Sequence, residues 1–338
     1  MIKDYGYNDF FEQQFIELNK EGRFIIGRVT TDYGNGFKVI TDEGLFSSHI
    51  SGKLRYNETL FPVIGDFVLA TRADATSLVI HKVLKRKTAF KRKIAGDEFK
   101  EQVQGANFDY IFIVSSMNQE LNIRKLERYI ITAWDTGAIP VIILTKADLA
   151  QDIEATKAEI EAIALGVNIH CVSSLYDINI GELDIYQSPG TTIALFGASG
   201  VGKSTLINTL AGEEVLKVNT VREDDDQGRH TTSHRELVKL DNGSLLMDTP
   251  GMRELGVWDD GEGISRTFED IVELETLCKF RNCTHKNEPG CAIINAIQQG
   301  ILEQKRYDAF IKLKKEASYN QMKAARKLLK AKKSMSKM

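Results

Sequence analysis

The residues in this sequence whose types and spacing most clearly predict chemistry run from Gly197 to Ser204. They match the pattern Gly-x-x-x-x-Gly-Lys-Ser, in which glycines let successive backbone N–H groups turn toward a phosphate. Lys203 would reach the β- and γ-phosphates, and the Ser204 hydroxyl would be a ligand of Mg²⁺. The alternative is a glycine-rich turn without a ligand, but the loop follows an apolar run and opens a helix-like segment, as phosphate binding requires. The residues expected to hold a nucleotide here are Gly197, Ala198, Ser199, Gly200, Val201, Gly202, Lys203, Ser204 and Thr205.

A second motif predicts which base the nucleotide carries. Residues 145–148, Thr-Lys-Ala-Asp, end the apolar run 141–144, at the place where GTPases carry Asn-Lys-x-Asp. The Asp148 carboxylate can accept hydrogen bonds from guanine N1–H and the 2-amino group, whereas adenine offers neither arrangement. We expect the aliphatic stem of Lys146 to lie along the purine face. Thr145 in place of Asn departs from the pattern and is expected to loosen this loop.

Three further segments fit the same site. Ser173 and Ser174 follow the next apolar run, at the place of the residues that support guanine O6. Residues 248–251, Asp-Thr-Pro-Gly, match Asp-x-x-Gly, in which Asp248 holds Mg²⁺ through water and the Gly251 N–H senses the γ-phosphate. Between the loop and Asp248 lies the sequence Gly-Arg-His-Thr-Thr, the natural place for a switch threonine that closes onto Mg²⁺. The candidate residues of this switch are His230, Thr231 and Thr232.

The elements that must position these motifs alternate between strand and helix. Apolar strand-like runs at 110–114, 141–144 and 169–172 alternate with helical patterns at 123–136 and 153–165, and two more strand-like runs cover 191–196 and 244–247. This alternation predicts an α/β domain built on a parallel sheet.

The N-terminal part has a different pattern. After a polar and aromatic lead-in of about 20 residues, five short runs rich in β-formers lie between residues 23 and 84 and are separated by turn signals. Five short strands at this spacing predict a small OB-like barrel, which either binds nucleic acid or has a purely structural role. A basic run at 85–93 follows, which is either a solvated linker or a contact to a phosphate backbone. The polar segment from Gly96 to Gly105 predicts a loop.

Near the C-terminus three of the four cysteines fall within fourteen residues. With one histidine they give the spacing Cys-x₄-Cys-x-His-x₅-Cys, which can place three thiolates and one imidazole around a tetrahedral zinc ion. A closed site with four protein ligands predicts a structural role for the metal. Cys171 lies outside the cluster and is expected in the core. The predicted zinc ligands are Cys278, Cys283, His285 and Cys291.

The order of the motifs is informative, because the base-reading segments at 145 and 173 precede the phosphate loop at 197. Ordinary small GTPases have the opposite order, so the chain resembles a circularly permuted GTPase. The chain combines a small barrel, permuted motifs, Gly-Arg-His-Thr-Thr, the sequence Asp-Thr-Pro-Gly-Met-Arg-Glu-Leu-Gly-Val-Trp and a cysteine cluster. This combination resembles the bacterial small-subunit-dependent GTPase family called RsgA or YjeQ. The resemblance covers about residues 20 to 310.

This resemblance implies GTP hydrolysis that is stimulated by the small ribosomal subunit, action late in the maturation of that subunit, contact with its rRNA, and one structural zinc. Met252 stands where many GTPases have the glutamine that orients the attacking water. Slow intrinsic turnover is therefore expected, with the missing group supplied by the partner or by His230. The alternative for His230 is a solvated switch residue.

Composition agrees with this class of protein. The chain has 338 residues, 42% of them hydrophobic, and a formal net charge of −3, so RNA binding must come from local basic patches. One such patch is the C-terminal stretch after Ile301, either a basic helix that seeks phosphate or a frayed tail. Because the sequence shows no signal peptide and no long apolar run, we expect a cytoplasmic protein without membrane contact, and a monomer.

The sequence therefore predicts three domains: an OB-like barrel with its lead-in at 1–88, a circularly permuted α/β P-loop GTPase domain at 89–257, and a zinc-binding α-helical region at 258–338. The cofactors expected are GTP or GDP, Mg²⁺ and one Zn²⁺. The sequence leaves two alternatives open. One is a P-loop ATPase or kinase, and the other is an RNA-binding module locked to its nucleotide with negligible turnover.

Overall fold

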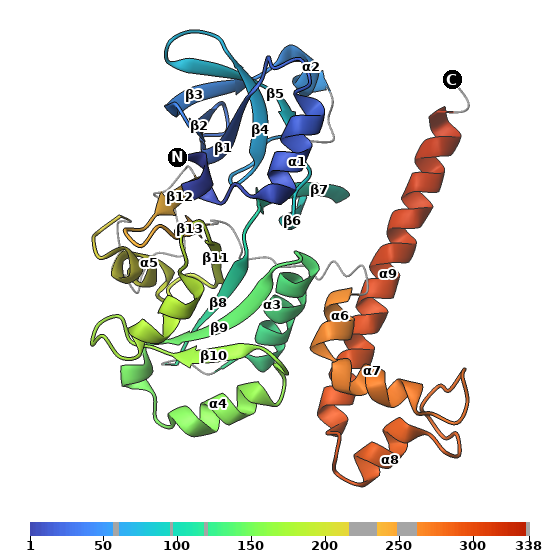
Figure 1. Ribbon diagram of the computed structural model, residues 1–338. Coiled ribbons are helices and arrows are strands. Elements are labelled where there is room, and N and C mark those ends of the chain that lie inside the picture. Colours follow the sequence, from blue (N-terminus) through green and yellow to red (C-terminus); the bar gives the residue numbers. More distant parts are fainter. Residues whose placement is uncertain (57–60, 95–96, 118–120, 216–234, 249–261, 336–338) are drawn as a thin grey trace.

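The computed structural model describes residues 1–56, 61–94, 97–117, 121–215, 235–248 and 262–335 (Figure 1). In chain order it forms a barrel, a hairpin, a mainly parallel sheet with helices, and a helical C-terminal region. Within these ranges no helix is both long and apolar enough to cross a bilayer.

The N-terminal barrel has the strand order β1-β2-β3-β5-β4, and β1 pairs with β4 to close it. Its elements are β1 (Ile25–Asp32), β2 (Phe37–Thr41), β3 (Gly44–Ile50), α2 (Gly52–Tyr56), β4 (Phe67–Arg72) and β5 (Ser77–Val83). β3 and β5 run parallel, and the core between the strands includes the fully buried Val29, Val39 and Leu78. The predicted five-stranded OB-like barrel is confirmed.

The lead-in packs between the barrel and the central sheet. It contains η1 (Ile2–Tyr5) and α1 (Asp9–Leu18), and the Phe11 ring lies 4.1 Å from the Phe67 ring of the barrel. Gly6 has a φ of 77°, and a Cβ at this position would lie 2.7 Å from the carbonyl oxygen of Gly190. Only glycine therefore allows the lead-in to approach the central domain this closely.

Arg28 of β1 is a buried cation at the same junction, with 1% of the residue exposed. Its guanidinium donates to the carbonyl oxygens of Tyr5, Gly65 and Asn107 and to the hydroxyl of Thr192, at 2.6 to 3.1 Å. Burial lowers its pKa to about 10, so the group remains charged at neutral pH. One side chain thus joins the lead-in, the barrel and the first residue of strand β11. No pattern in the sequence had singled it out.

The hairpin of β6 (Ala89–Ile94) and β7 (Asp97–Ala106) occupies the segment in which the sequence predicted a loop from Gly96 to Gly105. That prediction was wrong, because a polar segment can form a strand when a partner strand pairs its backbone N–H and C=O groups, as β6 does here. The neighbouring basic run is also partly structural. Arg86 makes two hydrogen bonds of 2.8 and 2.7 Å to the fully buried Asp66, and Lys87 forms an ion pair with Asp109.

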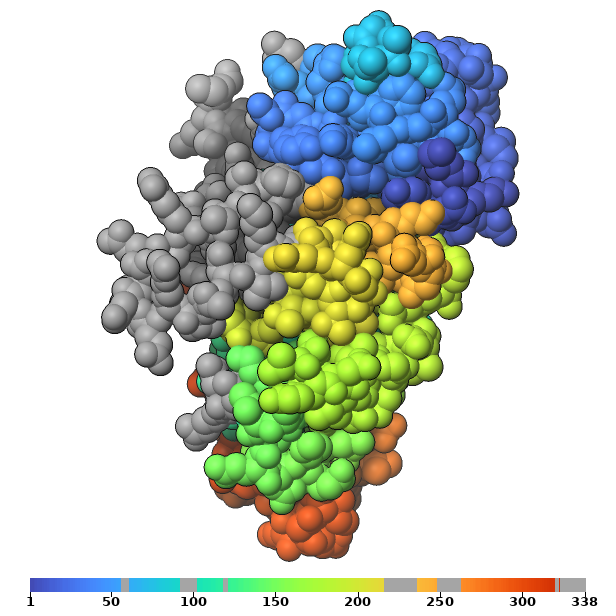
Figure 2. Space-filling model, turned by 90° about the vertical axis from the view of Figure 1, so that its left-hand side faces the viewer, coloured from blue at the N-terminus to red at the C-terminus, as the bar shows by residue number. Residues whose placement is uncertain are grey.

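The central sheet has the order β10-β9-β8-β11-β13-β12. Its strands are β8 (Tyr110–Ser116), β9 (Ile139–Thr145), β10 (Asn168–Cys171), β11 (Thr192–Gly197), β12 (Arg235–Lys239) and β13 (Leu245–Asp248). The first five strands in this order are parallel, which confirms the predicted parallel sheet, whereas β12 is antiparallel to β13. β12 also pairs briefly with β1, and Figure 2 shows its orange residues directly below the blue barrel.

Helices cover both faces of this sheet. They are α3 (Ile123–Asp135), η2 (Ala147–Leu149), α4 (Ile153–Glu161), η3 (Ile180–Tyr186) and α5 (Lys203–Ala211). In β8, Ile111 and Ile113 belong to the apolar cluster that contains α3 and α4, whereas Phe112 and Val114 belong to the cluster that contains α5 and η3. A parallel strand with both faces buried accounts for the continuous apolar run in the sequence.

The C-terminal region packs on α3. It contains α6 (Glu262–Thr267), α7 (Glu269–Thr276), α8 (Ala292–Gln298) and α9 (Gln304–Met335), and the far half of α9 extends away from the rest of the molecule (Figure 1). Arg128 of α3 forms a bidentate ion pair with Glu316 of α9. The predicted basic helix is present, but some of its cations form ion pairs within the chain. Arg306 binds Asp270, and Lys314 binds Glu275.

Candidate nucleotide and metal sites

The fold brings the predicted nucleotide residues to one edge of the central sheet. Because β9, β10, β11 and β13 are parallel, their carboxyl ends lie at the same edge. The chain moves from β8 toward β10 and later from β11 toward β13, so the strand order reverses between β8 and β11. Ligands of open α/β sheets bind in the crevice at such a reversal. Thr145 ends β9, Gly197 ends β11 and Asp248 ends β13.

The phosphate loop connects β11 to α5. A Cβ at Gly197 would lie 2.3 Å from the carbonyl oxygen of Val114, so only glycine lets β11 end this close to β8. Gly202 has a φ of 94° and is the N-cap of α5, which begins at Lys203. Lys203 Nζ donates to the carbonyl oxygens of Gly197 and Ala198 at 2.9 and 2.5 Å. The loop therefore presents a helix N-terminus and an ammonium group together, which is the chemistry that binds phosphate.

Thr145 links the base-reading loop to the phosphate loop. Its hydroxyl donates to the carbonyl oxygen of Val201 at 2.5 Å and also lies 3.1 Å from that of Ser115. Lys146, in the left-handed region at a φ of 58°, donates from Nζ to the carbonyl oxygen of Gly200 at 3.1 Å. The sequence suggested a looser loop at Thr145, but the hydroxyl makes a direct hydrogen bond to the phosphate loop.

Asp148 and Ser173 meet between the ends of β9 and β10. The Ser173 hydroxyl donates to Oδ1 of Asp148, and Ser173 is only 1% exposed. The backbone of the two loops is also joined, because the N–H of Ala147 donates to the carbonyl oxygen of Val172 at 3.1 Å. A carboxylate offers about four lone-pair sites, so one bond from Ser173 orients Asp148 and leaves it able to accept two more. Ser174, half-buried, follows directly.

The remaining predicted residues of this site lie outside the described residues. They are His230, Thr231, Thr232 and Gly251, together with Met252. For Asp248 the structure describes the backbone at the end of β13 and not the side chain. Their roles therefore remain predictions from the sequence.

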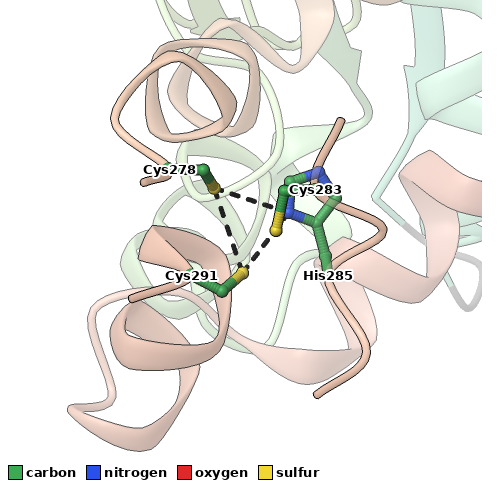
Figure 3. A group of neighbouring side chains, drawn as sticks. All are labelled: Cys278, Cys283, His285 and Cys291. Atoms are coloured by element: carbon green, nitrogen blue, oxygen red, sulfur yellow. Dashed lines mark hydrogen bonds between the residues drawn. The ribbon is translucent and has the colours of Figure 1, made fainter. Parts of the chain in front are cut away.

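The predicted metal ligands converge between α7 and α8 (Figure 3). The ligand atoms of Cys278, Cys283, His285 and Cys291 all lie within 4.8 Å of one another. Cys278 Sγ lies 3.9 Å from Cys291 Sγ, and His285 Nδ1 lies 3.6 and 3.4 Å from these two sulfurs. In a tetrahedral site, zinc bonds of about 2.3 Å to sulfur and 2.0 Å to nitrogen place two sulfurs roughly 3.8 Å apart and a sulfur and a nitrogen roughly 3.5 Å apart. The donor set and its spacing therefore fit zinc.

The surroundings of the cluster support metal binding by the imidazole. Nδ1 of His285 faces the sulfurs, while Nε2 lies 3.6 Å from a carboxylate oxygen of Glu275. In metal sites a carboxylate that accepts a hydrogen bond from the outer nitrogen fixes the tautomer and strengthens the ligand, and Glu275 is placed close to that position. Burial, together with the neighbouring thiols, raises the pKa of Cys283 to about 11, as expected for thiols held together without a cation. Sequence reasoning did not identify Glu275, although it precedes Cys278 by less than one helical turn.

The phosphate loop follows β11, the base-reading loops end strands that precede it in the chain, and a barrel lies at the N-terminus. This arrangement is that of a circularly permuted P-loop GTPase. Residues 83–258 match the family model described as "RsgA GTPase". The chain is 41% identical over 321 residues to "Small ribosomal subunit biogenesis GTPase RsgA 2" of Listeria monocytogenes, covering 94% of this chain and 90% of that protein. "Small ribosomal subunit biogenesis GTPase RsgA" of Methanosarcina acetivorans is 39% identical over 320 residues, covering 94% of this chain and 86% of that protein.

Solved structures agree with these relatives. The crystal structure of YjeQ from Thermotoga maritima matches with a TM-score of 0.66 at 26% identity and covers 87% of this chain and 98% of that one. YloQ, described as a circularly permuted GTPase, matches with a TM-score of 0.61 at 25% identity, with 87% and 95% covered. The chain belongs to the RsgA GTPase family. It is therefore an enzyme that hydrolyses GTP, and the alternative of an ATPase or kinase is set aside.

Proposed function

We propose that this chain hydrolyses GTP to GDP and phosphate in response to the small ribosomal subunit, and that it acts in the late maturation of that subunit. The observation that carries the proposal is the meeting of Asp148, Ser173 and the phosphate loop at one edge of the sheet. The names of the relatives, which specify biogenesis of the small ribosomal subunit, support the choice of partner.

In this proposal each residue of the site has one task. Asp148, oriented by Ser173, accepts hydrogen bonds from guanine N1–H and the 2-amino group. Lys203 exchanges its two backbone carbonyl partners for the β- and γ-phosphate oxygens, and the N–H groups at the start of α5 receive the same phosphates. Thr145 keeps the base-reading and phosphate loops at a fixed spacing, so that base and phosphates are held together.

Mg²⁺, when bound, neutralises charge that develops on the phosphates. Ser204 and Thr232 are its proposed protein ligands, with Asp248 acting through water. Because Met252 has no group that can orient water, we expect slow turnover by the isolated protein and stimulation by the ribosomal subunit, with His230 as a candidate group within the chain.

The other parts of the chain are proposed to contact rRNA. We retain domain bounds of 1–88, 89–257 and 258–338, with the barrel and the zinc-binding region as the two arms that flank the GTPase domain. Zinc bound by the Cys/His cluster would hold the second arm in shape. We propose a monomer that works in the cytoplasm, where its ribosomal partner is assembled.

The test is phosphate release from GTP under multiple turnover, with purified small subunits, with large subunits, and with neither. We expect at least a tenfold stimulation by small subunits alone. Thr232→Ala should reduce that stimulation more than it weakens GDP binding, which needs no γ-phosphate contact. Stimulation by neither subunit would contradict the proposed partner, and no turnover in any condition would support a nucleotide-locked binding module instead.

A further inference from the structure

A chain of polar side chains joins β10 to η3 beside the base-reading loop. Asn168 Nδ2 donates to the Tyr186 hydroxyl at 3.0 Å, this hydroxyl lies 2.9 Å from His170 Nε2, and His170 Nδ1 lies 2.8 Å from Glu182 Oε2. We call these four residues the loop clasp. None of them belongs to a phosphate, base or metal motif.

The partners determine how the protons are placed in the clasp. An ionised Glu182 can only accept, so His170 Nδ1 carries a proton and donates to it. In the neutral imidazole Nε2 is then an acceptor, and it receives the Tyr186 hydroxyl proton. The Tyr186 oxygen in turn accepts from the amide of Asn168. Each of the three hydrogen bonds thus has one donor and one acceptor, and all three donate in the same direction, from Asn168 toward Glu182.

The clasp is anchored in the core at one end and reaches solvent at the other. Tyr186 is 4% exposed, and its ring packs edge-on against Tyr110 and Phe112 of β8 at 5.1 and 5.5 Å. The side chain of His170 is 13% exposed, whereas that of Glu182 is 49% exposed. The bond between His170 and Tyr186 is therefore sheltered from water, and that to Glu182 is weakened by solvent.

The clasp closes the ends of the segment that carries Ser173. Inside this segment Ser173 and Ile178 exchange two backbone hydrogen bonds of 3.0 Å, and Asn179 Nδ2 donates to the carbonyl oxygen of Cys171. The tip has little apolar packing, because Leu175 and Tyr176 are 78% and 65% exposed. Among the described strands β10 lies at the outer edge of the sheet, and β9 is its one neighbour there (Figure 1). Val172 and Leu183, both fully buried, anchor the segment in the core, and the polar contacts position the part between them.

We propose that His170, Tyr186 and Glu182 are positioning residues for guanine recognition. By fixing both ends of the segment, the clasp holds the Ser173 hydroxyl against Asp148 and keeps this carboxylate turned toward the base. The inference rests on the proposed role of Asp148 in guanine binding. None of the three residues is proposed to contact the nucleotide.

The test compares GDP with inosine diphosphate, which lacks the 2-amino group that Asp148 is proposed to bind. The affinities of both ligands and the rate of GDP release are measured for the full-length protein. His170→Ala and Tyr186→Phe should speed GDP release by about tenfold. They should also reduce the preference for GDP over inosine diphosphate by at least about threefold, since the hydrogen bond from Ser173 to the charged Asp148 is lost or misdirected. Glu182→Ala should have a smaller effect, about threefold on release, because its carboxylate is half exposed.

Two variants serve as controls. Glu182→Gln retains an acceptor for the His170 proton and should stay within about twofold of wild type, since a neutral hydrogen bond replaces a charged one. Tyr176→Phe removes a hydroxyl from the exposed tip of the same segment and should change nothing. The ratio of the two affinities does not depend on the fraction of folded protein, so a merely structural role would leave it unchanged.

An unchanged ratio in both His170→Ala and Tyr186→Phe would overturn the inference. Equal losses in Glu182→Gln and Glu182→Ala would also contradict the hydrogen-bonded chain. Failure of the underlying proposal gives a different result, because wild-type protein would then bind GDP and inosine diphosphate equally well.

Discussion

At the scale of single residues, base selection is proposed to depend on the Asp148 carboxylate. Asp148→Asn replaces an acceptor by an amide, which can donate to the C2 carbonyl of xanthine but opposes the guanine amino group. Two hydrogen bonds to a charged group, each of about 1.5 kcal/mol or more, correspond to a loss of about 100-fold or more in GTP affinity. Xanthosine triphosphate should bind more tightly to the variant than to wild type. Fluorescent-nucleotide titration measures both, and unchanged GTP affinity would remove Asp148 from the base pocket.

Thr145 provides a second prediction at this scale. Thr145→Val keeps the shape but removes the hydroxyl that donates to the carbonyl oxygen of Val201. Loss of this hydrogen bond, at about 1 to 1.5 kcal/mol, should weaken GDP binding by about five- to tenfold. Thr145→Ser retains the hydroxyl and is the matched control. Equal GDP affinities of Thr145→Val and Thr145→Ser would show that this bond does not set the spacing of the two loops.

At the scale of elements, the Cys/His cluster is proposed to bind zinc and thereby to stabilise the loop between α7 and α8. Wild-type protein should contain one zinc per chain by elemental analysis, and Cys283→Ser should contain close to none. Since structural zinc contributes directly to folding free energy, the variant should also lose at least about 3 kcal/mol of stability in the C-terminal region. Cys171→Ala, which changes a buried cysteine outside the cluster, should keep its zinc. Freshly prepared wild-type protein without zinc would refute the site.

The pKa of Cys283 adds a pH dependence to metal binding. In the absence of metal its pKa is raised to about 11, so the thiol is protonated at neutral pH and zinc must displace that proton. Zinc affinity should therefore rise with pH, and zinc should be released as the pH falls from 8 to 5. Adding zinc to metal-free protein in weak buffer should acidify the solution, which a pH electrode measures directly. Metal binding without proton release would mean that the thiols are already ionised.

At the scale of the whole molecule, Arg28 joins the barrel to the strand that leads into the phosphate loop. Arg28→Met would leave several buried acceptors without their donor, at about 1 to 3 kcal/mol for each group that water cannot reach. We expect the free energy of unfolding to fall by about 2 to 4 kcal/mol in urea, and the variant to scatter X-rays as a more extended particle. Arg28→Lys should not restore stability, because an ammonium group lacks the planar fork that reaches separate acceptors. Arg23→Met, at an exposed arginine just before the barrel, should be neutral.

Much of this molecule could be predicted from short stretches of sequence. The strands of the barrel and of the parallel sheet follow from residues that are close in the chain. The predicted phosphate loop, the Lys146 and Asp148 pair and the four predicted zinc ligands rest on the same kind of local pattern. Backbone geometry relates such spacing directly to structure: strands alternate or are wholly apolar, a glycine allows a turn, and ligands a few residues apart can reach one ion. The permutation could also be predicted, because the order of the motifs is read directly along the chain.

Only the tertiary structure decided which charged side chains form ion pairs within the protein. Arg86, Arg306 and Lys314 belong to basic runs that suggested RNA contact, yet each binds a carboxylate of the same chain. Arg28 and the loop clasp likewise derive their roles from segments that meet only after folding. A charged or polar side chain has no preferred partner along the sequence, and its partner is determined by which distant backbone folds beside it. Local spacing therefore determined the chemistry that this chain carries, and packing between distant segments decided which side chains hold that chemistry in place.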